Sequence, residues 1–390
     1  MPMRLKIIET IEMINSKLDE RIENNDFSLL IGNSGVILYK AYYNKVFKKN
    51  HYNLNENLSD LFNHLSKNIN STTFCNGISG ICWTYKHLIN NNFIDADINA
   101  LDELDDLIGE KMIADMRHEN YDFLHGALGS LWYFLESNIN RKYDFIIAEC
   151  IKSLKKISKH TDNNSVYWDF TDHTGKNNIS NFSLSHGMSG ILIILAECYK
   201  QNIEQTICKD LIYKGINQIK KYKRKTPISN TLYPNSNAEY SLDKQSRLAW
   251  CYGDLGIATM FRRVGEVFND ESLIRDSNEI ILENAKRKNL DEAHVMDALI
   301  CHGSSGIAMI FKTFYEKTNI STLKDAYMFW LEQTIAFNNQ KNLSGFKAYR
   351  YERGATLETG LLEGIAGIGL FLLNELSEDK NEWTKALLLI

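Results

Sequence analysis

Long stretches of this chain are apolar at nearly every position, and each of them opens with Gly-x-x-Gly. The seven glycine pairs are Gly32/Gly35, Gly77/Gly80, Gly126/Gly129, Gly187/Gly190, Gly253/Gly256, Gly303/Gly306 and Gly364/Gly367. A helix that is apolar on all sides is typical of a position buried all round. The pattern therefore predicts seven inner helices, with glycines at their starts where the backbone turns tightly and neighbouring chains approach closely.

A second kind of segment, amphipathic in pattern, precedes each glycine pair. Apolar residues recur there at intervals of three, four and seven, with polar or charged residues between them. These segments are residues 5–24, 55–69, 99–117, 143–159, 205–222, 271–288 and 321–338. Each one predicts an outer helix. Seven repeats of an outer and an inner helix predict an all-α fold, an α/α toroid.

Composition and spacing favour one unit. The chain has 44% hydrophobic and 24% charged residues, only three prolines, and no low-complexity block or Pro/Ser/Gly-rich linker. We therefore expect a single toroidal domain over residues 1–390. The intervals before the fourth and fifth glycine pairs contain the polar segments Thr161 to Phe182 and Lys225 to Gln245. We expect loops or short hairpins there, over the mouth of a central cavity that a peptide could enter.

Charge and the N-terminal pattern exclude some partners and locations. The net charge of −5 and the mixed distribution of charges give no basic surface for a nucleic acid. Residues 1–13 alternate charged and apolar positions, so they predict neither a signal peptide nor a membrane span. A cytoplasmic, reducing location is expected, in which the seven cysteines are thiols or metal ligands instead of disulfides.

The residues just before each glycine pair differ between repeats, and equivalent positions should meet around the central cavity. Cys251 and Cys301 lie two residues before the first glycine of repeats five and six, and His302 lies one residue before that of repeat six. Two thiolates and an imidazole are ligands that zinc prefers, and three protein ligands leave a fourth position open, as in catalytic zinc sites. The alternative is a pair of buried cysteines with a hydrogen-bonded histidine.

Other zinc chemistries have signatures that the sequence lacks. There is no His-Glu-x-x-His segment, which would indicate a metalloprotease helix. There is no Cys-x-x-Cys segment and no histidine followed two residues later by glutamate, so the signature of a nucleobase deaminase is missing as well.

Three segments together resemble a known family. They are Arg247-Leu248-Ala249-Trp250-Cys251-Tyr252-Gly253, Cys301-His302-Gly303 and Ser185-His186-Gly187. Set in seven repeats, they resemble the lanthionine synthetase C-like proteins, the lanthipeptide cyclases. The resemblance implies a zinc enzyme that adds cysteine thiols of a dehydrated ribosomal precursor peptide to dehydroalanine or dehydrobutyrine, which closes thioether rings. A dehydratase and an export transporter are its expected partners.

The resemblance also implies roles for residues outside the metal ligands. His186 would donate or accept a proton, and Asp122 would orient a histidine or assist proton movement. Arg247 would bind an enolate or a carboxylate, because its side chain stays charged. Tyr252 would donate a hydrogen bond. For Glu363 we expect only a contribution to the start of its helix, where negative charge is favoured.

Two other functions remain open at this point. One is a different zinc-thiolate alkyltransferase on a toroidal scaffold, such as a relative of the protein prenyltransferases, which would need a carboxylate ligand and a basic cluster for a diphosphate. The other is a non-catalytic protein that binds glutathione or peptides. Cys75 shares the register of Cys251 and Cys301, but repeat two lies across the ring, so we assign it to packing or to the lining of the cavity. His125 shares the register of His302 and receives no role.

Overall fold

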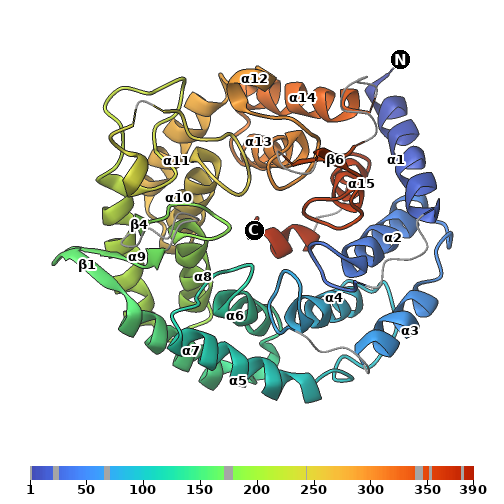
Figure 1. Cartoon of the computed structure of the whole chain (residues 1–390), viewed down its shortest axis with the longest axis horizontal. Coiled ribbons are helices and arrows are strands. Elements are labelled where there is room, and N and C mark those ends of the chain that lie inside the picture. Colours follow the sequence, from blue (N-terminus) through green and yellow to red (C-terminus); the bar gives the residue numbers. More distant parts are fainter. Residues whose placement is uncertain are drawn as a thin grey trace.

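The chain folds into two concentric rings of helices (Figure 1). The computed structural model describes residues 2–20, 26–65, 71–170, 179–242, 244–338, 346–350, 354–378 and 382–390. The inner helices are α2 (Asn33–Phe47), α4 (Ile78–Asn90), α6 (Ala127–Glu136), α8 (Met188–Lys200), α10 (Asp254–Phe268), α13 (Ser304–Thr318) and α15 (Ile365–Asn374). The outer helices are α1 (Met3–Glu20), α3 (Leu54–Leu65), α5 (Glu103–Arg117), α7 (Asp144–Ile157), α9 (Gln205–Lys220), α11 (Glu271–Asn284) and α14 (Ser321–Ala336).

Each inner helix packs against its two neighbours in the ring, and α15 packs against α2, which closes it. The inner helices are the most apolar elements of the chain, and most of their side chains are fully buried. The outer helices bury one face only, as their amphipathic patterns predict. The α/α toroid is therefore confirmed, and each predicted helix has a counterpart among the described residues; the predicted helix ends at 21–24 and 66–69 lie outside them.

The glycine pairs are explained by the loop that precedes each inner helix. This loop folds back over the helix start, so that a Cβ atom at Gly306 would lie 2.0 Å from the carbonyl oxygen of Ile300. Gly253 is more restricted still. Its φ is +91° and its ψ is −168°, a region open almost only to glycine, and a Cβ atom there would lie 2.0 Å from the carbonyl oxygen of Arg247.

We expect Gly253→Ala to lower the free energy of unfolding by about 1–3 kcal/mol from backbone strain alone, with a further loss from the contact with Arg247. Gly354→Ala is a matched control, because Gly354 also has a positive φ (+71°) but no atom within 4 Å of the added Cβ. Denaturant unfolding of both variants would measure the difference. Equal losses of stability would contradict the role assigned to the Arg247 contact.

A circle of backbone hydrogen bonds joins the loops before the inner helices. The bonds link residues that lie two positions before the first glycine of each repeat. The donor and acceptor pairs are Leu362 to Leu30, Leu30 to Cys75, Cys75 to Leu124, Ser185 to Cys251, Cys251 to Cys301 and Cys301 to Leu362, at N···O distances of 2.8–3.4 Å. The amide of Leu124 donates instead to the Asp122 carboxylate, at 2.8 Å. The circle brings equivalent positions of the repeats together at one end of the toroid.

The first polar insertion forms short hairpins in its described part, as expected, whereas the described part of the second has only isolated β-bridges and the 3-10 helix η2 (Asn237–Glu239); residues 171–178 of the first lie outside the described residues. The hairpin of β1 (Lys159–Asp162) and β2 (Ser165–Tyr167) packs against the outer helix α9 instead of covering the cavity. The pair β3 (Asp169–Phe170) and β4 (Ile179–Ser180) continues into Asn181, which bridges to Ser236 near the 3-10 helix η2 (Asn237–Glu239). Here the two insertions meet beside the loops that start α8 and α10.

Further elements follow the sixth repeat and were not predicted. A hairpin of β5 (Ala348–Arg350) and β6 (Gly354–Thr356) lies between α14 and α15. The C-terminal 3-10 helix η3 (Glu382–Leu387) enters the hollow of the ring, where the chain ends (Figure 1). Its backbone accepts hydrogen bonds from two inner-ring indoles, from Trp132 to the Lys385 carbonyl and from Trp250 to the Leu387 carbonyl, at 3.0 and 2.9 Å. The short helices η1 (Ile139–Arg141) and α12 (Leu290–Ala293) complete the elements.

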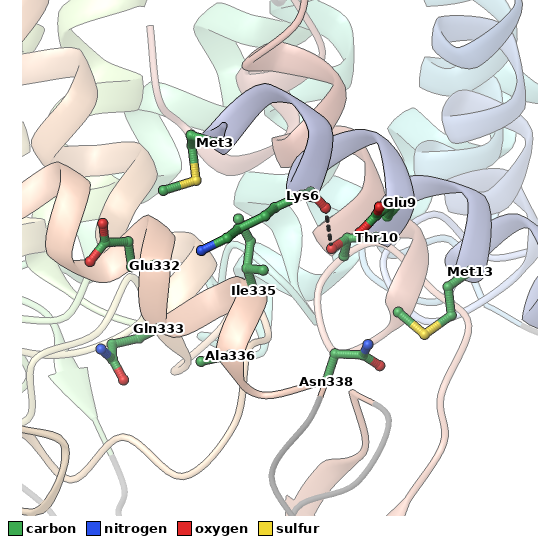
Figure 2. A pocket seen from close by; sticks show the side chains of 10 residues that line it. All are labelled: Met3, Lys6, Glu9, Thr10, Met13, Glu332, Gln333, Ile335, Ala336 and Asn338. Atoms are coloured by element: carbon green, nitrogen blue, oxygen red, sulfur yellow. Dashed lines mark hydrogen bonds between the residues drawn. The ribbon is translucent and has the colours of Figure 1, made fainter. Parts of the chain in front are cut away.

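A groove of about 760 Å³ lies on the outer ring between α1 and α14, and it is lined by side chains such as Lys6, Met13 and Glu332 (Figure 2). None of the candidate catalytic or metal-binding residues predicted from the sequence lines this groove. Among the described residues, no helix combines the length and the apolar character needed to cross a membrane.

Candidate active site

The thiols of Cys251 and Cys301 lie side by side in the loops that start α10 and α13. Both residues are almost fully buried, at 8% and 9% exposure. The two thiols share a hydrogen bond that, together with the nearby positive charges of His302, Arg247 and His186, outweighs burial and lowers the pKa of Cys251 to about 7. The same contact raises the pKa of Cys301. The thiol pair therefore loses one proton near neutral pH, and the negative charge holds the second proton in place.

His302 is held by a carboxylate that the sequence analysis missed. Its Nε2 atom lies 3.3 Å from Oδ2 of Asp297, whose side chain is only 1% exposed. Asp297 in turn accepts hydrogen bonds from the backbone amides of Leu299 and Tyr349, at 3.1 and 3.3 Å. A carboxylate that fixes a histidine ring is a regular feature around metal-binding histidines. Because Nε2 faces Asp297, Nδ1 of His302 is the nitrogen free to bind a metal.

Glu363 joins this group from the loop before α15. Ligand atoms of Cys301, His302 and Glu363 all lie within 4.8 Å of one another, close enough for the three residues to hold a metal ion. We expected Glu363 to contribute only to the start of its helix. The N-cap residue of α15 is Gly364, and the main feature of Glu363 is its proximity to Cys301 and His302. Glu363 lies one residue before the first glycine of its repeat, as His302 does, and repeat seven adjoins repeat six. This shared position, one residue before the first glycine, was the sequence signal that could have placed Glu363 beside His302.

His186 and Asp122 form a second pair, from the loops before α8 and α6. Nδ1 of His186 lies 2.6 Å from Oδ2 of Asp122, so Nδ1 carries the hydrogen and Nε2 is left to exchange a proton. Burial opposes the charged imidazole, but the hydrogen bond and the charge of Asp122 outweigh burial and raise the pKa of His186 above its ordinary value. The thiolate charge of Cys251 adds to the rise. This acid–base pair therefore favours the protonated imidazole relative to a histidine without such a partner.

Arg247 and Tyr252 lie on either side of Cys251 in sequence. The charge of Arg247 acts on both Cys251 and His302. Its Nη2 donates to the His294 carbonyl at 3.4 Å, whereas its Nε is buried with no hydrogen-bond partner among the described residues. The ring of Tyr252 lies 6.1 Å from that of His186, and its hydroxyl accepts a long hydrogen bond (3.5 Å) from Asn181.

Cys75 and His125, which share the registers of the predicted ligands, lie outside the metal-binding group, although His125 borders the acid–base pair. Cys75 is 4% exposed, and burial is the main reason that its pKa is raised, to about 12. His125 stacks against His186 with ring centroids 6.1 Å apart, and burial lowers its pKa. Neither side chain belongs to the thiol pair or to the group around Glu363.

The donor types fit a zinc ion, although the group whose ligand atoms all lie within 4.8 Å of one another contains Cys301, His302 and Glu363 and leaves out Cys251. The thiol pair and the Asp297-bound imidazole supply the soft and nitrogen ligands that zinc prefers, and one thiol already ionises near neutral pH. The seven predicted residues thus lie at one end of the toroid, six of them in two groups. Cys251, Cys301 and His302 form the first with Arg247, and His186 and Asp122 form the second beside Tyr252.

Comparisons with known proteins identify the family and the fold of the chain. The family model of the lanthionine synthetase C-like protein matches residues 23–388. The chain is 26% identical over 423 aligned residues to the nisin biosynthesis protein NisC of Lactococcus lactis subsp. lactis, an alignment that covers 98% of this chain and 95% of NisC. The solved structure of nisin cyclase superimposes with a TM-score of 0.77 at 22% identity, over 98% of this chain and 97% of that one. The chain belongs to the lanthionine synthetase C-like family.

Proposed function

We propose that this protein is a lanthipeptide cyclase, which adds cysteine thiols of a dehydrated precursor peptide to dehydroalanine or dehydrobutyrine. The observation that carries the proposal is the convergence of the thiol pair with His302, beside a histidine–aspartate pair, in a member of this family. We further propose that it acts in the cytoplasm, and that a dehydratase supplies its substrate and a transporter exports its product.

Cys251, Cys301 and His302 would hold the zinc ion in this proposal. Bound zinc lowers the pKa of a coordinated thiol, so that the sulfur is a nucleophile at neutral pH. The negative charge of the Cys251 and Cys301 thiolates would keep the sulfur of the substrate cysteine electron-rich, and therefore reactive. Asp297 fixes the orientation of the His302 ring, and burial of the thiol pair limits access of water.

His186, supported by Asp122, supplies the proton that the addition requires. When the substrate sulfur attacks the β-carbon of the dehydro residue, a C–S bond forms and the π electrons move toward the carbonyl oxygen as an enolate. His186, protonated at Nε2, then donates its proton to the α-carbon, and Asp122 stabilises the charged imidazole before the transfer. The raised pKa of His186 favours the acid form relative to an ordinary histidine.

Arg247 stabilises the enolate. Its guanidinium is always charged, and the buried Nε has no protein partner in the described structure, so a hydrogen bond to a substrate oxygen would satisfy it. Tyr252 lines the same space between Asn181 and His186 and can hydrogen-bond the peptide.

The alternative functions are separated by specific features. Glu363 lies with Cys301 and His302, so it could be the carboxylate that an alkyltransferase of the prenyltransferase kind would need, but the site keeps a second thiol, because Cys251 is hydrogen-bonded to Cys301. A binder of glutathione or peptides would not need a histidine whose proton is kept available by a carboxylate. Both observations favour the cyclase.

Ring closure on a dehydrated peptide tests the proposal. The addition leaves the mass of the peptide unchanged, so free thiols must be trapped with N-ethylmaleimide before mass spectrometry. We expect the zinc-loaded protein to consume thiols and to form no product with prenyl diphosphates. Tight binding of the peptide without thiol consumption would instead support the binder.

Asp122→Asn is expected to move the alkaline limb of the pH–rate profile to lower pH. Without the carboxylate, burial dominates and the pKa of His186 falls, so the proton donor is lost at a lower pH than in the wild type. Above neutral pH the rate should fall by about tenfold or more. Rates of thiol consumption from pH 5 to 9 would measure the shift.

Asp26→Asn is the control for Asp122→Asn. Asp26 lies in the equivalent loop of repeat one, at the same end of the toroid, and the substitution also removes one negative charge. It should leave the alkaline limb in place. An equal shift in both variants would mean that overall charge, and not the hydrogen bond to His186, sets the profile.

A further inference from the structure

The guanidinium of Arg224 is buried with most of its hydrogen-bond donors unused. Arg224 follows the end of α9 and is only 7% exposed. Its Nη2 atom donates a long hydrogen bond (3.4 Å) to the Leu242 carbonyl, whereas Nε and Nη1 have no hydrogen-bond partner among the described residues. A buried charge is costly unless an opposite charge and hydrogen bonds compensate it. The unused donors therefore indicate a site for an anion.

Arg224 lines a pocket of about 370 Å³ between the segment after α9 and the outer helix α11. Two glutamates of α11 line the same pocket, but both are paired with other cations. Glu279 accepts from Lys223, and Glu283 accepts from Lys286, each at 2.6 Å. Because these carboxylates are already engaged, the charge of Arg224 remains for a ligand that enters the pocket.

Apolar side chains flank this charge. Leu232 lines the pocket, and two exposed apolar side chains, Tyr240 and Leu242, lie beside it. The ring of Tyr240 packs edge-on against that of Tyr222, two residues before Arg224, with ring centroids 5.4 Å apart. The carbonyl of Leu242 accepts the hydrogen bond from Arg224. A guanidinium with apolar neighbours suits a carboxylate that is adjacent to an apolar side chain, because hydrogen bonds and apolar burial then act together.

The pocket is connected to the active-site end of the toroid. The amide of Arg224 donates to the Leu232 carbonyl at 2.8 Å, and the amide of Leu232 donates to the Asp254 carboxylate at 2.7 Å. Asp254 is the first residue of α10 and follows the loop that contains Cys251. Asn284, the last residue of α11, donates to the same carboxylate at 2.8 Å. A peptide whose cysteines reach the thiol pair therefore passes the pocket at the same end of the molecule.

We propose that this pocket binds a carboxylate of the precursor peptide, from an aspartate or glutamate adjacent to an apolar residue and outside the segment that reacts. The identity of the peptide rests on the proposed function, whereas the chemistry of the ligand rests on Arg224 and its neighbours. A contact remote from the thiol pair holds the peptide while successive cysteines react, because a tethered segment has a high effective concentration at the active site.

Two dye-labelled peptides with capped ends test the pocket by fluorescence anisotropy, without ring closure. One contains a single Glu beside a Leu, and its twin has Gln in place of the Glu. We expect the wild type to bind the Glu peptide about tenfold or more tightly, because the Gln twin lacks the charge-assisted hydrogen bond to Arg224. Arg224→Gln should bind both peptides equally weakly. Lys209→Gln removes one charge from an exposed position of α9 and should behave as the wild type.

Leu242→Ser tests the apolar contact at an exposed position, where folding does not depend on the side chain. It should weaken binding of the Glu peptide about threefold or more, and an unchanged affinity would remove that contact from the proposal. Equal binding of the two peptides to the wild type, or a preference for Glu that survives in Arg224→Gln, would overturn the carboxylate site. Binding of inorganic phosphate without any preference for the Glu peptide would show a site for small anions and would overturn it as well. Failure of ring closure with the Glu preference intact would instead contradict the proposed function.

Discussion

Cys301→Ala is expected to abolish stoichiometric zinc binding and to lower the rate of ring closure by more than about a hundredfold. This loss exceeds the roughly 10–100-fold loss that is usual when a residue hydrogen-bonded to a metal ligand is replaced, because here the ligand itself is removed. Cys301 contacts both sides of the site, since it shares a hydrogen bond with Cys251 and lies within 4.8 Å of His302 and Glu363. Without Cys301, no metal ligand would lie between Cys251 on one side and His302 and Glu363 on the other. Cys251→Ala should have a similar effect. Zinc content by atomic absorption and thiol trapping on a dehydrated peptide would measure the two consequences.

Cys75→Ala is the matched control for Cys301→Ala. Cys75 occupies the equivalent position of repeat two, takes part in the same circle of backbone hydrogen bonds and is similarly buried. Its side chain lies outside the proposed metal site, so zinc content and activity should stay close to those of the wild type. Full zinc content and activity in Cys301→Ala, or loss of both in Cys75→Ala, would contradict the ligand assignment.

The repeated architecture was predictable because its causes are local and recur. Each glycine pair marks a place where a loop carbonyl approaches the helix start, as Ile300 approaches Gly306, and any side chain there would clash. Each apolar run can be buried only between two similar neighbours. From these features the sequence predicts the toroid, and the register before the glycines predicts that Cys251 and Cys301 approach each other.

The sequence alone could not single out Glu363 and Asp297 as members of the site. Glu363 was visible in the register of His302, but a lone glutamate at a helix start has a common electrostatic explanation. Only the structure brings its carboxylate to His302 and Cys301. Asp297 reaches His302 within the same loop, and it lies six residues before the first glycine of its repeat, as Asp26, Asn120 and Asn181 do in theirs, so its position was visible in the sequence although its partner was not.

The elements after repeat six were missed for a different reason. The 3-10 helix η3 is stabilised by burial inside the ring and by the indole hydrogen bonds of Trp132 and Trp250. Those partners lie more than a hundred residues away in sequence. Such an element depends on the finished ring, so local propensity does not reveal it. The β5–β6 hairpin likewise depends on its contact with Asp297, through the amide of Tyr349.

His186→Asn is expected to keep zinc and to lower the rate of ring closure by about 10²–10⁴-fold, the usual contribution of a positioned general acid. The substitution removes the proton donor but leaves Cys251, Cys301 and His302 in place. Because Asn does not titrate, the alkaline limb that His186 produces should disappear from the pH–rate profile. His125→Asn is the control, since His125 stacks on His186 from the equivalent position of repeat three and contacts neither thiol of the pair in the described structure. It should lower the rate far less. Loss of zinc in His186→Asn, or an equal loss of rate in His125→Asn, would remove His186 from the proton-transfer step.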